Sequence, residues 1–114
     1  MSPTTLMLRD ALSGDPEAQF NMARAYELGD GVPKDVAKAI EWYEKAARNG
    51  NESAMYNLGV IHELGLKGGE ADAGQAAFWY GKAMEKGNTN AMASLGYLFE
   101  TGGGSIEADP FKAL

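Results

Sequence analysis

The 114-residue sequence contains no cysteine and a single histidine, His62. Without cysteine the chain has no disulfide framework and no thiol chemistry. With one imidazole and no thiol, the usual ligand sets of a zinc site are excluded, and no serine has a positioned base beside it. We therefore expect no catalytic residue, no metal site and no cofactor.

Basic residues and long apolar runs are also scarce. Ten Lys and Arg stand against sixteen Asp and Glu, which gives a net charge of −6. Phosphate binding and docking to an anionic membrane both need a basic surface, so we expect neither nucleic acid nor lipid as a partner. No apolar stretch approaches the roughly 18 residues of a membrane span. Residues 1–10 lack the basic and apolar regions of a signal peptide, so we expect a cytoplasmic address. A periplasmic or secreted address stays open if a signal was removed.

The residues that are present favour helices arranged as repeats. Alanine is abundant and β-branched residues are few. Three sets of positions recur at intervals of 36 or 37 residues: Gly14, Gly50 and Gly87; Gly29, Gly65 and Gly102; and Asp35, Asp72 and Asp109. A period of this size with two helices in each copy predicts an all-α solenoid, in which stacked helix pairs share one core.

The period divides the chain into four segments. We expect an N-terminal capping helix over 3–13, repeat one over 14–49, repeat two over 50–86 and a partial repeat three over 87–114. Apolar residues at helical spacing fill each expected helix, and glycines fall mostly between the helices, where turns and C-caps favour them.

Helix starts are marked by capping residues. Asp15 followed by Pro16, Asp35 and Asp72 each suit an N-cap, and Ser53 or Asn51 opens the first helix of repeat two. The last expected helix begins at residue 109 and has only five further residues, which is marginal for a helix alone. We expect a longer array, a docked last turn, or an exposed apolar end that promotes self-association.

These spacings match the motif Ala-x3-Leu-Gly-x2-Tyr-x2-Gly-x-Gly-Val, followed by Asp-x2-Lys-Ala-x2-Trp-Tyr-x-Lys-Ala-Ala-x2-Gly. Repeat one carries Ala18, Met22, Ala23, Tyr26, Gly29, Gly31, Val32, Asp35, Lys38, Ala39, Trp42, Tyr43, Lys45, Ala46, Ala47 and Gly50. Repeat two carries Ala54, Leu58, Gly59, His62, Gly65, Asp72, Ala76, Trp79, Tyr80, Lys82, Ala83 and Gly87. Over residues 14–114 the chain resembles the Sel-one-like repeat (SLR) family, which is related to the tetratricopeptide repeats. It departs from the pattern at Met22-Ala23, where Leu-Gly is usual, and at His62 and Phe99, where tyrosine is usual.

The resemblance implies a right-handed superhelix that scaffolds protein complexes, often in bacterial signalling, envelope or effector contexts. The residues agree with such packing. Small side chains at Ala23, Gly59 and Gly96 are expected to let paired helices approach closely. The Trp-Tyr pairs at 42–43 and 79–80 are expected to fill the layers between helices.

If the likeness to tetratricopeptide repeats holds, the first helix of each repeat lines a concave face. The partner-binding residues predicted there are Phe20, Arg24, Glu27, Tyr56, Val60, Glu63, Tyr97 and Glu100. Glu27, Glu63 and Glu100 align with one another, and a glutamate row beside aromatic anchors suits a basic or amphipathic peptide. The alternative is that the glutamates are solvated helix-end charges and that Phe20 and Tyr56 pack on a neighbouring helix.

His62 occupies the position of Tyr26 and Phe99, so we expect it to have a structural role. The glycines at 68–69 and 102–104 lack the strand and the Lys-Ser/Thr of a phosphate-binding loop, and are expected to form turns. The sequence therefore favours a protein-binding adaptor or scaffold that is not an enzyme. Two alternatives remain: a hydrolase related to secreted repeat proteins that act on cell walls or β-lactams, or a purely structural segment of a larger repeat protein.

Overall fold

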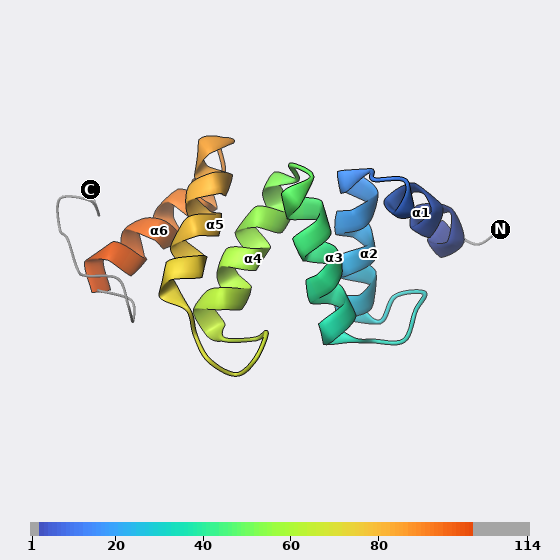
Figure 1. Ribbon diagram of the computed structural model, residues 1–114, viewed down its shortest axis with the longest axis horizontal. Helices are drawn as coiled ribbons and strands as arrows, with labels where there is room; N and C mark the ends of the chain where they lie inside the picture. The colour runs from blue at the N-terminus through green and yellow to red at the C-terminus, as the bar shows by residue number, and fades with distance from the viewer. Residues whose placement is uncertain (1–2, 102–114) are drawn as a thin grey trace. The chain divides into compact units, whose positions relative to one another are not determined.

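The computed structural model describes residues 3–101, which fold into helices joined by short turns (Figure 1). The helices are α1 (Pro3–Leu12), α2 (Pro16–Leu28), α3 (Val36–Arg48), α4 (Glu52–Leu64), α5 (Ala73–Glu85) and α6 (Thr89–Thr101). Between residues 3 and 101 there is no strand. The chain divides into two compact units, Met1–Ala54 and Met55–Leu114. The helix expected from Asp109, and the self-association predicted for that end, lie outside the described residues.

The predicted helix starts are confirmed. The side-chain oxygens of Asp15, Asp35 and Asp72 each accept a hydrogen bond from a backbone N–H two or three residues further on, at 3.0 to 3.1 Å. In α4 the cap is Asn51 and not Ser53, because the Asn51 side-chain oxygen accepts from the N–H of Ala54 at 2.8 Å. These bonds satisfy backbone donors that the first turn of a helix leaves without a partner.

In the unit Met1–Ala54, α1 packs on α2, and α2 packs along α3 (Figure 1). Met22 and Ala23 of α2 and Tyr43 and Ala46 of α3 are buried. Small side chains such as alanine at these buried positions allow the two helices to approach closely, and Tyr43 contributes a large buried ring.

One buried polar side chain connects all three helices of this unit. The Gln19 side-chain amide donates to the carbonyl of Ala11 at the end of α1, at 3.0 Å. The Gln19 side-chain oxygen accepts from the side-chain amide of Asn49, just after α3, at 2.9 Å. A buried amide is costly unless it is hydrogen-bonded, and here both ends of the amide have partners. Nothing in the repeat pattern singled out this residue.

In the unit Met55–Leu114, the core contains Leu58 of α4, Ala76 and Tyr80 of α5, and Ala91 of α6. Gly59 is required where α4 meets α5, because a Cβ built there would lie 2.4 Å from the ring of Tyr80. The expectation that a small residue at this position permits close approach is therefore confirmed.

The two tryptophans differ in burial, although they were expected to fill equivalent layers. Trp42 is buried, whereas Trp79 is half-buried. Beside Trp79, Phe78 is 51% exposed, and the two rings pack edge to face with centroids 5.0 Å apart. Repeat one has Glu41 at the position of Phe78, so this adjacent aromatic pair is particular to repeat two.

Candidate partner-binding surface

In repeat one, the predicted binding residues of α2 form a cluster with a tyrosine of α3. The Tyr43 hydroxyl donates a 2.6 Å hydrogen bond to the carboxylate of Glu27. The ring of half-buried Phe20 lies with its centroid 5.8 Å from that of Tyr43. The Arg24 guanidinium carbon lies 6.0 Å from the Phe20 centroid. Cation, two rings and carboxylate thus form one cluster, in which Arg24 and Glu27 are exposed and the ring of Tyr43 is buried.

Repeat two builds the same core of the cluster with different neighbours. The Tyr80 hydroxyl donates to Glu63 at 2.6 Å, and the Tyr56 and Tyr80 centroids are 5.7 Å apart. Val60 stands where repeat one has Arg24, so no cation flanks the rings at this position. Tyr56, Val60 and Glu63 are all half-buried.

The environment of Tyr80 keeps its hydroxyl protonated. Burial raises the pKa of the Tyr80 phenol well above its ordinary value, and the hydrogen bond to Glu63 and the negative charge of that carboxylate raise it further. A hydrogen bond with Ser94 lowers the pKa of Tyr80 and partly offsets this rise. Tyr80 is therefore a neutral donor at physiological pH, and the glutamate is the acceptor.

The third predicted group lies on α6, where Tyr97 is 58% exposed and Glu100 is also exposed. Ala93 stands at the position of Phe20 and Tyr56, and the second helix of repeat three lies outside the described residues. The structure thus brings the predicted residues together within repeats one and two. Phe20 and Tyr56 each contact a tyrosine of the following helix, as the packing alternative expects, and each keeps part of its surface exposed.

Sequence reasoning did not identify the tyrosine hydroxyls as partners of the glutamate row. The available signal was that a glutamate and a tyrosine recur together in both repeats, 16 residues apart in one and 17 in the other. Turning that recurrence into a contact requires knowing how the two helices pack.

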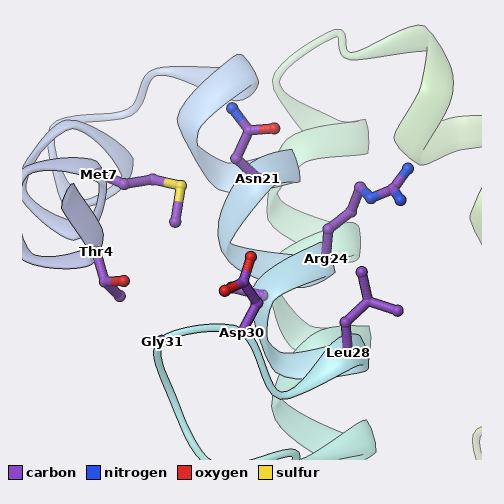
Figure 2. A pocket seen from close by; sticks show the side chains of 8 residues that line it. Thr4, Met7, Asn21, Arg24, Leu28, Asp30 and Gly31 are labelled. Atoms are coloured by element: carbon purple, nitrogen blue, oxygen red, sulfur yellow. The ribbon is translucent and has the colours of Figure 1, made fainter.

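A concave feature lies in the unit Met1–Ala54, between α1, α2 and the loop that follows α2 (Figure 2). Its volume is about 650 Å³. It is lined by Thr4, Met7, Asn21, Arg24, Ala25, Leu28, Asp30 and Gly31. Among these, Arg24 belongs to the predicted binding residues, so the groove adjoins the cluster of repeat one.

Residues 3–101 show no sign of a metal site or of a membrane span. No group of three His, Asp or Glu side chains there is arranged to hold a metal ion. No helix in that part of the chain has the length and apolarity needed to cross a membrane. His62 is half-buried on α4, and its structural role stays a prediction. Gly68 and Gly69 lie in the turn between α4 and α5.

The sequence model of the Sel1 repeat family matches residues 16–51, 52–88 and 89–114. The chain therefore belongs to the Sel1 repeat family, which confirms the resemblance drawn from its motifs. Two solved structures with the same fold confirm the all-α solenoid class. One is c5321, a protective antigen of uropathogenic Escherichia coli that displays an SLR fold, with 30% identity and a TM-score of 0.86 over 96% of this chain and 23% of that one. The other is a Sel1 repeat protein from Oxalobacter formigenes, with 32% identity and a TM-score of 0.88 over 96% of this chain and 44% of that one.

Three curated relatives match about half of the chain. The chitin synthase regulator SKT5 of Saccharomyces cerevisiae is 39% identical over 64 residues, 53% of this chain and 9% of that protein. The ERAD-associated E3 ubiquitin-protein ligase component HRD3A of Arabidopsis thaliana is 38% identical over 61 residues, 54% of this chain and 9% of that protein. The DAP3-binding cell death enhancer 1 of Rattus norvegicus is 33% identical over 58 residues, 51% of this chain and 11% of that protein. The matches span about a tenth of these relatives.

Proposed function

We propose that the chain is a protein–protein interaction module, an adaptor or scaffold, that holds a protein or peptide on the first helices of its repeats. Membership of the Sel1 repeat family supports this role. The relatives' names describe a regulator, a component of a ligase complex and a binding protein, which are roles exercised through other proteins.

The observation that carries the proposal is the hydrogen bond from a buried tyrosine to a glutamate at the surface, which recurs in both repeats at 2.6 Å. A carboxylate has two oxygens and about four acceptor positions, so one bond to a phenol leaves capacity for a partner's donor. The tyrosine also restricts the rotamers of the glutamate before any partner arrives. Fewer rotamers are then lost on binding, which favours affinity.

The partner we propose is a basic or amphipathic peptide. Glu27, Glu63 and Glu100 supply negative charge on successive first helices, and partly exposed rings at Phe20 and Tyr56 supply apolar contact area. The net charge of −6 attracts a basic partner from a distance.

The test replaces Glu27, Glu63 and Glu100 together by glutamine, which keeps the shape of each side chain and removes its charge. The matched control replaces Glu41, Glu70 and Glu85, three exposed glutamates outside the first helices, in the same way. The probe is a fluorescent amphipathic peptide of alternating leucine and lysine pairs, and anisotropy gives its affinity at low and moderate salt. We expect about a tenfold weaker affinity and a flatter salt dependence for the first variant, and a smaller change for the control. Equal affinities for the unchanged chain and the first variant would contradict the proposal.

A further inference from the structure

The groove between α1 and α2 is lined partly by apolar and partly by polar residues. Met7 of α1 and Ala25 and Leu28 of α2 are apolar, and Leu28 is largely exposed. Asp30, Asn21 and Thr4 are polar, and the carboxylate of Asp30 accepts hydrogen bonds without donating any. A ligand that matches both the apolar and the polar lining has an apolar stem and a hydrogen-bond donor at its end.

The charge offered to such a ligand is negative. Figure 2 shows the Asp30 carboxylate rising from the loop after α2 into the space between Met7 and Arg24. The Arg24 side chain extends in the opposite direction from Thr4 and Met7, and its guanidinium lies near the ring of Phe20. Arg24 therefore lines the groove with its aliphatic stem, while its cation is directed toward the neighbouring cluster.

The approach of the loop to α1 shapes one end of the groove. Gly31 has a φ of +77°, and a Cβ at this position would lie 2.3 Å from the Thr4 hydroxyl oxygen. Both observations require glycine, because a side chain would strain the backbone and push the loop away from α1. Glycine at position 31 thus allows the loop that carries Asp30 to lie next to Thr4.

Repeat two does not reproduce these features. Leu66 stands 36 positions after Asp30, and Ile61 stands 36 positions after Ala25. The position that carries a carboxylate in repeat one thus carries an apolar side chain in repeat two. The helix that forms the opposite wall, α1, belongs to the N-terminal segment.

We propose that this groove receives a lysine side chain of a basic peptide, with the ammonium group bound by Asp30 and the four-carbon stem lying against Met7 and Ala25. Lysine combines a flexible apolar stem with a compact cation that has three donors. The stem matches the apolar lining of the groove, and the cation matches its carboxylate. The volume of about 650 Å³ falls within the usual range for ligand sites and accommodates neighbouring peptide residues as well. The inference rests on the proposed function, because it assigns one anchoring contact of the same class of partner.

The experiment uses a blocked five-residue peptide with one lysine between two leucines, and a second peptide in which the lysine is acetylated. Each is titrated into the isotope-labelled chain and followed by amide chemical shifts. We expect the lysine peptide to shift the amides of Met7, Ala25 and Asp30, and acetylation to weaken its binding about tenfold by removing the charge. Absence of shifts at these residues would overturn the inference.

Two variants and two controls complete the test. Asp30→Asn removes the charge, and Asp30→Leu introduces the side chain of repeat two; each is expected to weaken binding of the lysine peptide about tenfold. Glu70→Gln removes the same charge from the corresponding loop of repeat two and is expected to leave the affinity unchanged. Circular dichroism checks that each variant is folded. The amphipathic peptide of the proposed function is titrated into the unchanged chain and into Asp30→Asn, so that the two proposals are tested separately. If the unchanged chain binds the amphipathic peptide while Asp30→Asn leaves the affinity for the lysine peptide unchanged, the groove inference is overturned and the proposed function stands.

Discussion

The hydroxyls of Tyr43 in repeat one and Tyr80 in repeat two make the same 2.6 Å hydrogen bond to a glutamate of the preceding helix. What surrounds the two bonds differs. Repeat one has Arg24 beside the rings, where repeat two has Val60. The shared part joins two helices and orients a glutamate, and the differing part is the side chain four positions after Phe20 or Tyr56. The comparison therefore separates the tyrosine–glutamate pair that both repeats have from the cation that repeat one has and repeat two lacks at this position.

The interiors of the two repeats also differ in the side chains that occupy equivalent buried positions. At the closest approach of the first helix, repeat one has Ala23 and repeat two has Gly59 against the ring of Tyr80. Nearby, Gln19 of repeat one is buried through two hydrogen bonds, whereas Met55 at the equivalent position is buried as an apolar side chain. Equivalent backbone positions thus tolerate different chemistry when the neighbouring side chains change with them.

The largest expected effect concerns the tryptophans. Trp42→Ala is expected to lower the free energy of unfolding by about 4 kcal/mol, because Trp42 is buried and the substitution leaves a cavity. Trp79→Ala is expected to cost less, about 3 kcal/mol, because Trp79 is more exposed than Trp42. Urea denaturation followed by circular dichroism measures both. Equal costs would show that the two repeats use their tryptophans alike, contrary to their difference in burial.

A smaller effect is expected where the first helix meets the tyrosine ring. Gly59→Ala introduces a methyl group that would overlap the Tyr80 ring, and it is expected to destabilise the chain by about 2 kcal/mol although alanine favours helix. The reciprocal change in repeat one, Ala23→Gly, is expected to cost about 1 kcal/mol through lost helix propensity and a small cavity. Thermal or urea unfolding measures the stability of both variants, Gly59→Ala and Ala23→Gly. A stabilising effect of Gly59→Ala would contradict the close approach seen in the structure.

The smallest of the three effects concerns the tyrosine hydroxyls. Tyr80→Phe is expected to cost about 1.5 kcal/mol, because it removes a hydrogen bond to a carboxylate in a mostly buried setting. Tyr43→Phe is expected to cost about 0.5 kcal/mol, because its partner Glu27 is exposed to water. Unfolding at neutral pH measures both, and a larger cost at Tyr43 would reverse the ranking of the two repeats.

The pH dependence follows from the raised pKa of Tyr80. In the unfolded chain a tyrosine loses its proton near its ordinary pKa of about 10, whereas the folded chain keeps the Tyr80 proton to higher pH. The folded state therefore binds more protons above about pH 10, so this contribution to stability is complete below that pH and is lost as the pH rises further. Comparing unfolding at about pH 8 and about pH 11, we expect Tyr80→Phe to fall less steeply than the unchanged chain. If the stability of the unchanged chain and that of Tyr80→Phe fell equally between the two pH values, the raised pKa of Tyr80 would be contradicted.

Local features were predictable because their causes lie within a few residues. The caps at Asp35 and Asp72 bond to amides three positions away, so composition and spacing suffice to place them. The choice between Ser53 and Asn51 could not be made from composition, since both types cap helices well. It was settled by which side chain meets the amide of Ala54. The repeat period likewise predicted the helices, because identical spacing demands identical packing, and the resemblance of the motif residues indicated the family.

Contacts between distant positions were decided by the tertiary structure. The bond from Asn49 to Gln19 spans 30 positions, and the bonds from the tyrosines to the glutamates span 16 and 17. Whether such side chains meet depends on how far helices slide and rotate against each other, which the side-chain volumes of both helices set together. The same holds for the groove, because its two walls come from α1 and α2 and its carboxylate from the loop beyond them. Periodicity therefore defines which faces of the helices pack, and only their packing creates the surface clusters and the groove.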